Sequence, residues 1–140
     1  MPFSAPETAA PGGTETVLLV EDEEQVRRMA RRVLEAHGYT VLCATNGREA
    51  LAVAAAAGDE VELVVTDVIM PEMGGAALAE VFRRSRPTLP VLFLSGYTGD
   101  DLGRNGIVAS EVRFLQKPFS PGALASAVRQ ALDAAANRTA

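Results

Sequence analysis

The chain has 140 residues, which is the usual length of a single domain. Its formal net charge of −5 disfavours a general nucleic-acid-binding surface, and its single cysteine, Cys43, excludes an internal disulfide framework. No apolar run approaches the ~20 residues that a membrane span needs. The N-terminus lacks the basic and apolar regions of a signal peptide. These features predict a cytoplasmic domain that contacts neither nucleic acid nor membrane directly.

The first residues of the chain differ in composition from the rest. Residues 1–15 are rich in proline, alanine, glycine and threonine and show no apolar periodicity, which is typical of a flexible linker or arm. We therefore expect an arm over 1–15, one folded domain over 16–136 and a short tail over 137–140. The composition of the arm also hints at a longer natural chain.

Apolar segments alternate with segments of helical spacing along the expected domain. Strands are expected at 17–20, 40–44, 61–67, 91–94 and 112–116. Helices are expected at 26–37, from a cap at Asn46 to about 58, at 76–85, within 96–105 and after a cap at Ser120. This alternation predicts an α/β fold with a doubly wound, five-stranded parallel sheet. The three most apolar strands should be central, which gives the flavodoxin-like strand order 2-1-3-4-5.

The first expected helix is amphipathic. Its apolar residues share one face, and four arginines fall on the other face: Arg27, Arg28, Arg31 and Arg32. This pattern favours a helix face on which all four arginines face solvent over a phosphate-binding patch.

Polar side chains follow four of the expected strands at the point where each strand ends. Glu21 and Asp22 follow the first strand, Asp67 ends the third, Ser95 follows the fourth and Lys117 follows the fifth. In an open α/β sheet, ligands bind just beyond the carboxyl ends of the strands. We therefore expect three acids, a hydroxyl and an ammonium to meet at one edge of the sheet.

The residue types at this edge favour phosphoryl chemistry with a metal ion. No glycine-rich phosphate loop follows the first strand, and the acids that stand there would repel a dinucleotide. Carboxylates attract Mg²⁺, so Glu21, Asp22 and Asp67 are candidate ligands. Asp67 can then act as a nucleophile toward a phosphoryl group, with Lys117 and Ser95 as charge and hydrogen-bond donor. Each residue alone also has an ordinary structural explanation, and the five together favour the site.

Four segments carry a resemblance to a known family. They are LLVEDEE at 18–24, VVTDVIMPEMGG at 64–75, LFLSGYT at 92–98 and FLQKPFS at 114–120. With these segments the chain resembles the receiver domain of two-component response regulators, over about residues 16–136. The resemblance implies that Asp67 accepts a phosphoryl group from the phosphohistidine of a histidine kinase or histidine phosphotransfer domain. It implies a signalling domain of a phosphorelay and not an enzyme. Such a domain supplies catalytic groups only for its own phosphorylation and dephosphorylation.

The resemblance also assigns roles at the metal site. It implies that Asp22 and Asp67 ligate Mg²⁺ directly, that Glu21 assists through water, and that the backbone carbonyl of Ile69 adds a ligand. Glu21 departs from the family pattern, because aspartate is more usual at its position and the longer side chain changes the reach to the metal.

Further implied roles concern switching. Ser95 and Lys117 would bind the phosphoryl oxygens, and Phe114 would be the family's aromatic switch residue, working by packing because it lacks a hydroxyl. The face formed by the helix within 96–105, the strand at 112–116 and the last helix would then change its affinity for partners, and possible dimerisation would use the same face. The peptide bond between Lys117 and Pro118 is expected to be cis.

Several contexts remain open from the sequence. The residues of the SGYT and FLQKPFS motifs and the N-terminal arm favour the C-terminal receiver of a hybrid sensor histidine kinase. The alternative is a stand-alone single-domain regulator. An aspartate-nucleophile phosphatase would need a second acid where Ile69 stands. A flavodoxin-like cofactor carrier would need a phosphate loop after the first strand, and a degenerate docking receiver would lack one of the site residues.

Overall fold

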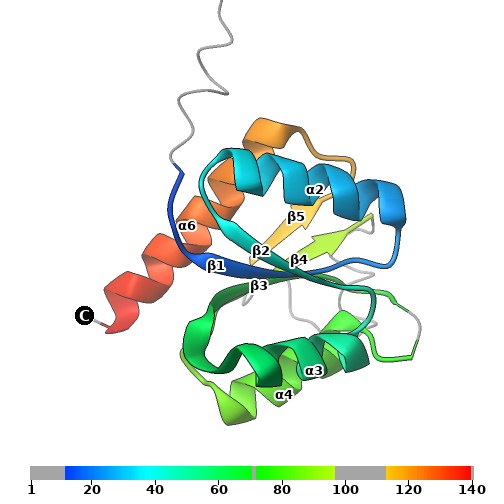
Figure 1. Ribbon diagram of the computed structural model, residues 1–140, viewed down its shortest axis with the longest axis vertical. Coiled ribbons are helices and arrows are strands. Elements are labelled where there is room, and N and C mark those ends of the chain that lie inside the picture. The colour runs from blue at the N-terminus through cyan, green and yellow to red at the C-terminus, as the bar shows by residue number, and fades with distance from the viewer. Residues whose placement is uncertain (1–11, 71, 97–112, 140) are drawn as a thin grey trace, which may run out of the picture.

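The computed structural model describes residues 12–70, 72–96 and 113–139 (Figure 1). One sheet of five parallel strands is built from β1 (Thr16–Val20), β2 (Thr40–Ala44), β3 (Val61–Asp67), β4 (Val91–Ser95) and β5 (Arg113–Gln116). The strand order is β2-β1-β3-β4-β5, which confirms the predicted doubly wound topology. The helices are α2 (Glu24–Ala36), α3 (Gly47–Ala57), α4 (Gly75–Ser85) and α6 (Pro121–Thr139), with a short 3₁₀ turn η1 (Gly58–Glu60). The helix expected within 96–105 lies outside the described residues, apart from Gly96.

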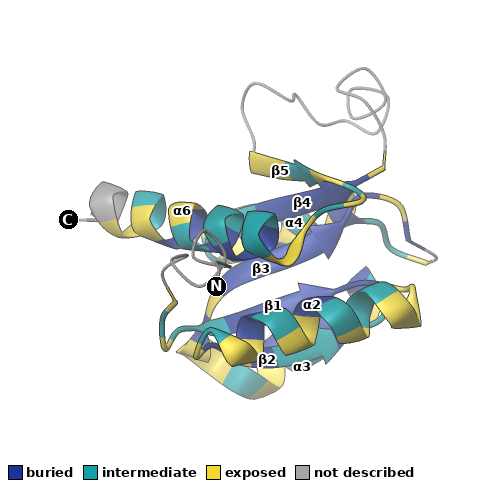
Figure 2. Ribbon diagram, turned by 90° about the horizontal axis from the view of Figure 1, so that it is seen from above, coloured by how far each residue is buried: buried dark blue, intermediate teal, exposed yellow. Residues whose placement is uncertain are grey.

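The helices cover both faces of the sheet, with α2 and α6 on one face and α3 and α4 on the other (Figures 1 and 2). Successive residues of a strand point to opposite faces. Accordingly, Val17 and Leu19 of β1 pack in the core under α2 and α6, whereas Leu18 and Val20 pack in the core over α3 and α4. The central strand β3 is buried on both faces at every position except Glu62, as its valine-rich sequence indicates.

Two helix starts follow from the cap residues in the sequence. The Asn46 side chain accepts a hydrogen bond from the Glu49 N–H at 2.8 Å, and the Ser120 hydroxyl accepts one from the Ala123 N–H at 3.1 Å. Both residues were predicted as caps. The last helix continues to Thr139, beyond the domain end expected at 136.

The end of the expected arm is part of the folded domain. Glu15 forms an ion pair with Arg129 of α6, with Oε2 at 2.7 Å from Nη2. Arg129 also donates to the Gly12 carbonyl at 3.1 Å, and the Gly13 N–H donates to the His37 carbonyl at 3.1 Å. Residues 12–15 thus contact the end of α2 and α6. Composition could not show this, because the partners are distant in sequence.

This ion pair gives a pH-dependent prediction. The Arg129 guanidinium lowers the pKa of the Glu15 carboxyl below its ordinary 4.5. A depressed folded-state pKa adds stability above the unfolded-state pKa, and that stability is lost as the pH falls. We expect Glu15→Gln to lower the free energy of unfolding by about 1 kcal/mol at pH 7. Chemical denaturation should show this difference shrinking below about pH 4.5. A difference that stays constant down to pH 3 would contradict the assignment.

Candidate functional site

The residues that follow β1, β3, β4 and β5 meet at one edge of the sheet, as predicted. Backbone hydrogen bonds extend the pairing past the strand ends. The Glu21 N–H donates to the Ala44 carbonyl at 3.0 Å, the Val68 N–H to the Leu94 carbonyl at 3.1 Å, and the Lys117 N–H to the Ser95 carbonyl at 2.8 Å. These bonds fix the start of each loop, so the side chains beyond the strands are carried by the rigid sheet and not by free loops.

The Lys117 ammonium lies at the centre of the site. Its Nζ is 2.7 Å from Glu21 Oε1, 2.9 Å from Asp67 Oδ2 and 3.5 Å from Glu23 Oε1. Only the contact with Asp67 has hydrogen-bond geometry. The peptide bond from Lys117 to Pro118 is cis, as predicted. The lysine therefore joins the end of β5 to the acids at the ends of β1 and β3.

Three carboxylates gather beside the lysine. One oxygen each from Glu21, Asp22 and Asp67 lies within 4.8 Å of the others, so the three side chains could hold a metal ion. Glu21 is fully buried, Asp67 is 8% exposed and Asp22 is exposed. Glu21 Oε1 makes no hydrogen bond of standard geometry among the described residues, and the Lys117 ammonium that pairs with it is shared with Asp67. A buried carboxylate that shares one ammonium with a second acid, next to a third, fits a hard divalent cation such as Mg²⁺.

The charges at the site do not balance. Burial raises the pKa of Glu21 from 4.5 to about 7, although the Lys117 ammonium opposes this shift. Burial also raises the pKa of Asp67, again against the effect of Lys117. For Lys117, burial lowers the pKa, but its contacts with Glu21 and Asp67 outweigh burial and the net shift is upward. One ammonium thus faces more negative charge than it can neutralise, and a further cation would be favoured here.

The other predicted residues take different positions. Ser95 is fully buried at the end of β4, in register with Gln116 of β5 and therefore one residue from Lys117. Phe114 lies further back on β5, in register with Phe93, and its side chain is 37% exposed. Ile69 follows β3 and is 45% exposed. Ser95 thus belongs to the cluster of site residues, whereas Phe114 lies two positions before the end of its strand.

Gly75, at the start of α4, is a site residue that the sequence did not single out. A Cβ atom on Gly75 would lie 2.2 Å from the Asp67 carbonyl oxygen, which no side chain permits. The Gly75 N–H also donates to the Val68 carbonyl at 2.9 Å. The close approach of α4 to the backbone of Asp67 is what requires glycine at this position.

A pocket of about 320 Å³ opens beside the lysine. It lies between α2 and the segment after β5, and its lining combines Glu23 and Lys117 with apolar residues, namely Val26, Met29, Pro118 and Phe119. Glu23 was not predicted as a site residue, and its acidic side chain stands at the edge of both the pocket and the acid cluster.

The fold and the site define a class of protein. The family model for the response regulator receiver domain matches residues 17–129. The chain belongs to this family, which is the receiver domain of two-component signalling systems. Receiver domains of this kind interact with histidine kinases or phosphotransfer proteins. No helix within the described ranges has both the length and the apolar character that a membrane span requires.

Individual relatives place the chain within the family. It is 45% identical over 121 residues to the sensor kinase CckA of Brucella abortus, covering 86% of this chain and 13% of that protein. It is 34% identical to the response regulator MprA of Mycolicibacterium vanbaalenii, covering 83% of this chain and 49% of that protein. The chain therefore spans at most about half the length of these two relatives.

Solved structures agree with the sequence relatives. The receiver domain of the hybrid histidine kinase CckA superimposes with a TM-score of 0.70 at 40% identity, covering 84% of this chain and 98% of that domain. The chemotaxis protein CheY4 of Vibrio cholerae superimposes with a TM-score of 0.76 at 30% identity, covering 86% of this chain and all of that protein.

Proposed function

We propose that this domain accepts a phosphoryl group on Asp67 from the phosphohistidine of a histidine kinase or histidine phosphotransfer domain. The observation that carries the proposal is the position of Asp67. Its carboxylate ends the central strand, lies 2.9 Å from the Lys117 ammonium, and adjoins two further acids. A nucleophilic carboxylate, a fixed cation and a candidate metal site are the parts that phosphoryl transfer needs.

The residues present fit a Mg²⁺ ion. Asp22 and Asp67 would ligate it directly, Glu21 would assist through water, and the backbone carbonyl of Ile69 would add a ligand. When bound, the ion supplies positive charge that screens the acids from one another and from the phosphoryl oxygens. These assignments rest on the donor types and on the clustering of three carboxylates around one ammonium, which Glu21 and Asp67 share.

The side chains at the site would have different roles in phosphoryl transfer. Asp67 Oδ1 accepts a hydrogen bond from the Val68 N–H at 3.0 Å, which fixes the direction of the carboxylate. An oxygen of this carboxylate attacks the phosphorus. The phosphorus–nitrogen bond of phosphohistidine breaks, its electron pair stays on the imidazole, and an acyl phosphate forms on Asp67. Lys117 and Ser95 would then bind the phosphoryl oxygens as charge and hydrogen-bond donor.

Phosphorylation would act on partners through packing. We infer that engagement of Ser95 by the phosphoryl group changes the space available to Phe114. The face that includes β5 and α6 would then alter its affinity for partners or for a second copy. Phe114 is partly exposed on this face, which supports the idea that its packing can change.

The wider context is also a proposal. The identity to the CckA kinase of Brucella abortus and to the CckA receiver structure favours the receiver of a hybrid sensor histidine kinase in the cytoplasm. A stand-alone single-domain regulator is the alternative, supported by the similarity to CheY4, which this chain matches over the whole of that protein.

Intact-mass spectrometry tests the phosphoacceptor. After incubation with a small phosphodonor such as acetyl phosphate and Mg²⁺, we expect one added phosphoryl group in the parent protein. Asp67→Asn should add none, because its amide is not a nucleophile. Chelation of the metal should suppress labelling of the parent. Stoichiometric labelling of Asp67→Asn would refute the assignment to Asp67, and unchanged labelling with chelator would refute the metal role.

A further inference from the structure

The loop between β1 and α2 carries two of the three candidate metal ligands, Glu21 and Asp22, but the helix start beside it is weakly capped. Glu23 is the N-cap residue of α2, and its side chain makes no cap hydrogen bond. The Glu23 N–H instead donates to Glu21 Oε2 at 3.0 Å. The buried Glu21 carboxylate, which belongs to the acid cluster, therefore also accepts a hydrogen bond from the N-cap residue of α2. The backbone conformation of this loop and the orientation of the Glu21 side chain thus depend on each other.

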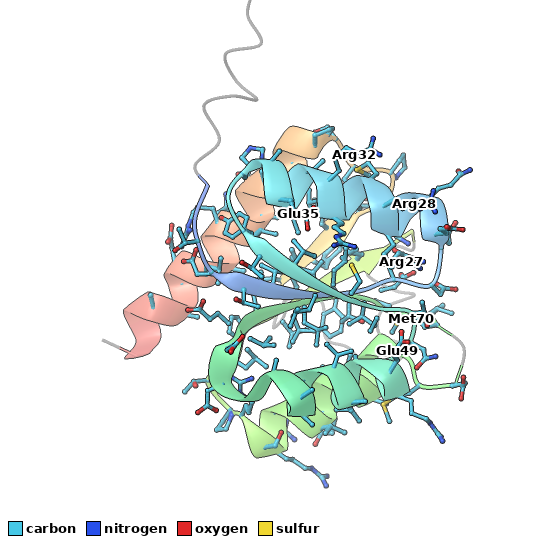
Figure 3. All side chains as sticks on the ribbon, viewed as in Figure 1. Arg27, Arg28, Arg32, Glu35, Glu49 and Met70 are labelled. Carbon is cyan, nitrogen blue, oxygen red and sulfur yellow. The ribbon has the colours of Figure 1, made fainter. Side chains whose placement is uncertain are left out.

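Arg27, in the first turn of α2, adds a second constraint on the same loop. Its Nη1 donates to the Glu21 carbonyl at 2.9 Å, and its side chain is partly buried. The prediction that all four arginines of the helix face solvent is therefore wrong for Arg27. The adjacent Arg28 differs, because its side chain is 73% exposed and pairs only with Glu24 among the described residues (Figure 3).

The charge of Arg27 is also placed differently from those of Arg28 and Arg31, which form ion pairs within the helix. Arg28 pairs with Glu24 and Arg31 pairs with Glu35, whereas no carboxylate of the described residues lies within 4.0 Å of the Arg27 guanidinium. Its positive charge instead lies against the backbone carbonyl that joins Glu21 to Asp22. That hydrogen bond ties the first turn of α2 to the loop that carries Glu21 and Asp22.

We propose that Arg27 is a positioning residue for metal binding: by holding the Glu21 carbonyl, it fixes the direction from which the Asp22 carboxylate approaches Asp67. The inference rests on the proposed function of the site. Asp22 is exposed, so the loop backbone, and not side-chain packing, sets where its carboxylate points. Loss of the Arg27 contact would leave the three acids present but less well aligned for one ion.

Calorimetric titration of the unphosphorylated protein with Mg²⁺ tests this proposal without any transfer reaction. Arg27→Met keeps the side-chain length but removes the charge and the donor. We expect it to weaken Mg²⁺ binding about tenfold, the effect of losing one hydrogen bond from a charged group. Arg28→Met removes an equal charge from the same helix turn and should leave the affinity within about twofold. Arg27→Lys keeps a charged donor and should restore part of the loss.

The outcomes separate the possible explanations. Equal weakening by Arg27→Met and Arg28→Met would overturn the proposal, because net charge alone would then explain the effect. Parent-like Mg²⁺ affinity of Arg27→Met would also overturn it, while loss of binding in Asp22→Ala would leave the proposed function standing. If Arg27→Met does not fold, by circular dichroism, Arg27→Ala takes its place: affinity between that of the parent and of Asp22→Ala supports the positioning role, and parent-like affinity contradicts it. Failure of the parent itself to bind Mg²⁺ or accept phosphoryl groups would refute the proposed function instead.

Discussion

Gly75→Ala is expected to reduce phosphoryl uptake on Asp67 by about a hundredfold, which is the effect of a ~1 Å misplacement of a reacting group. The added Cβ would lie 2.2 Å from the Asp67 carbonyl oxygen and 3.2 Å from the Val68 Cα. Both are backbone atoms, so no side-chain rotation relieves the clash, and either α4 or the end of β3 has to move. The initial rate of labelling by acetyl phosphate, followed by intact mass, measures this effect.

The same substitution should also lower stability. Forcing a methyl group into a packed contact costs about 1–3 kcal/mol of the free energy of unfolding. Gly58→Ala is a suitable control, because its Cβ would meet nothing within 4 Å and only its φ of +64° opposes alanine. That control should lose about 1 kcal/mol of stability and no labelling rate. Normal labelling by Gly75→Ala would show that the contact with Asp67 does not position the nucleophile.

Lys117→Met should destabilise the metal-free protein by about 3 kcal/mol, since it leaves buried acids without their cation. The pKa of Glu21 is already raised to about 7, and loss of the lysine would raise it further. A folded-state pKa above the unfolded-state value of 4.5 favours folding when the group is protonated, and that advantage is lost as the pH rises. The destabilisation should therefore be largest above pH 7 and smallest near pH 5. Urea denaturation with chelator present measures it.

The conservative variant separates charge from geometry. Lys117→Arg keeps the positive charge, so most of the stability should be retained. Its larger planar head does not match the position of a compact ammonium between Glu21 and Asp67, so labelling by acetyl phosphate should still fall. An equal loss of stability at pH 5 and pH 8 in Lys117→Met would contradict the proposed charge balance.

The part of the fold that the sequence predicts depends on short-range patterns. The valine-rich strands, the caps at Asn46 and Ser120, and the alternation of strand and helix all express local geometry, and together they gave the observed strand order. Glu21, Asp22, Asp67, Ser95 and Lys117 came from the same logic, because a parallel sheet brings the carboxyl ends of its strands to one edge whatever the details of packing. Ile69 and Phe114 came only from the family resemblance. Nothing beyond residue type and strand position was needed to bring Lys117 near Asp67.

The contacts that the sequence did not reveal are between segments far apart in the chain or depend on how closely two backbones approach. Glu15 and Arg129 are 114 residues apart, and no local pattern links them. The need for Gly75 arises only when α4 is packed against the end of β3. Arg27 has the same spacing as its solvent-facing neighbours, and only the bend of the preceding loop turns it toward the Glu21 carbonyl.

The ion pair between Glu15 and Arg129 has a consequence for how the domain can be connected to other molecules. It fastens the entry to β1 beside α6, at the end of the sheet opposite Asp67 (Figure 2). Because α6 runs back from the edge of the sheet that holds Lys117, the chain enters and leaves the domain on the same side. A tether or affinity tag fused at either terminus would attach at the end of the sheet opposite Asp67. The edge that holds Asp67 would then stay accessible to a donor as large as a helical bundle.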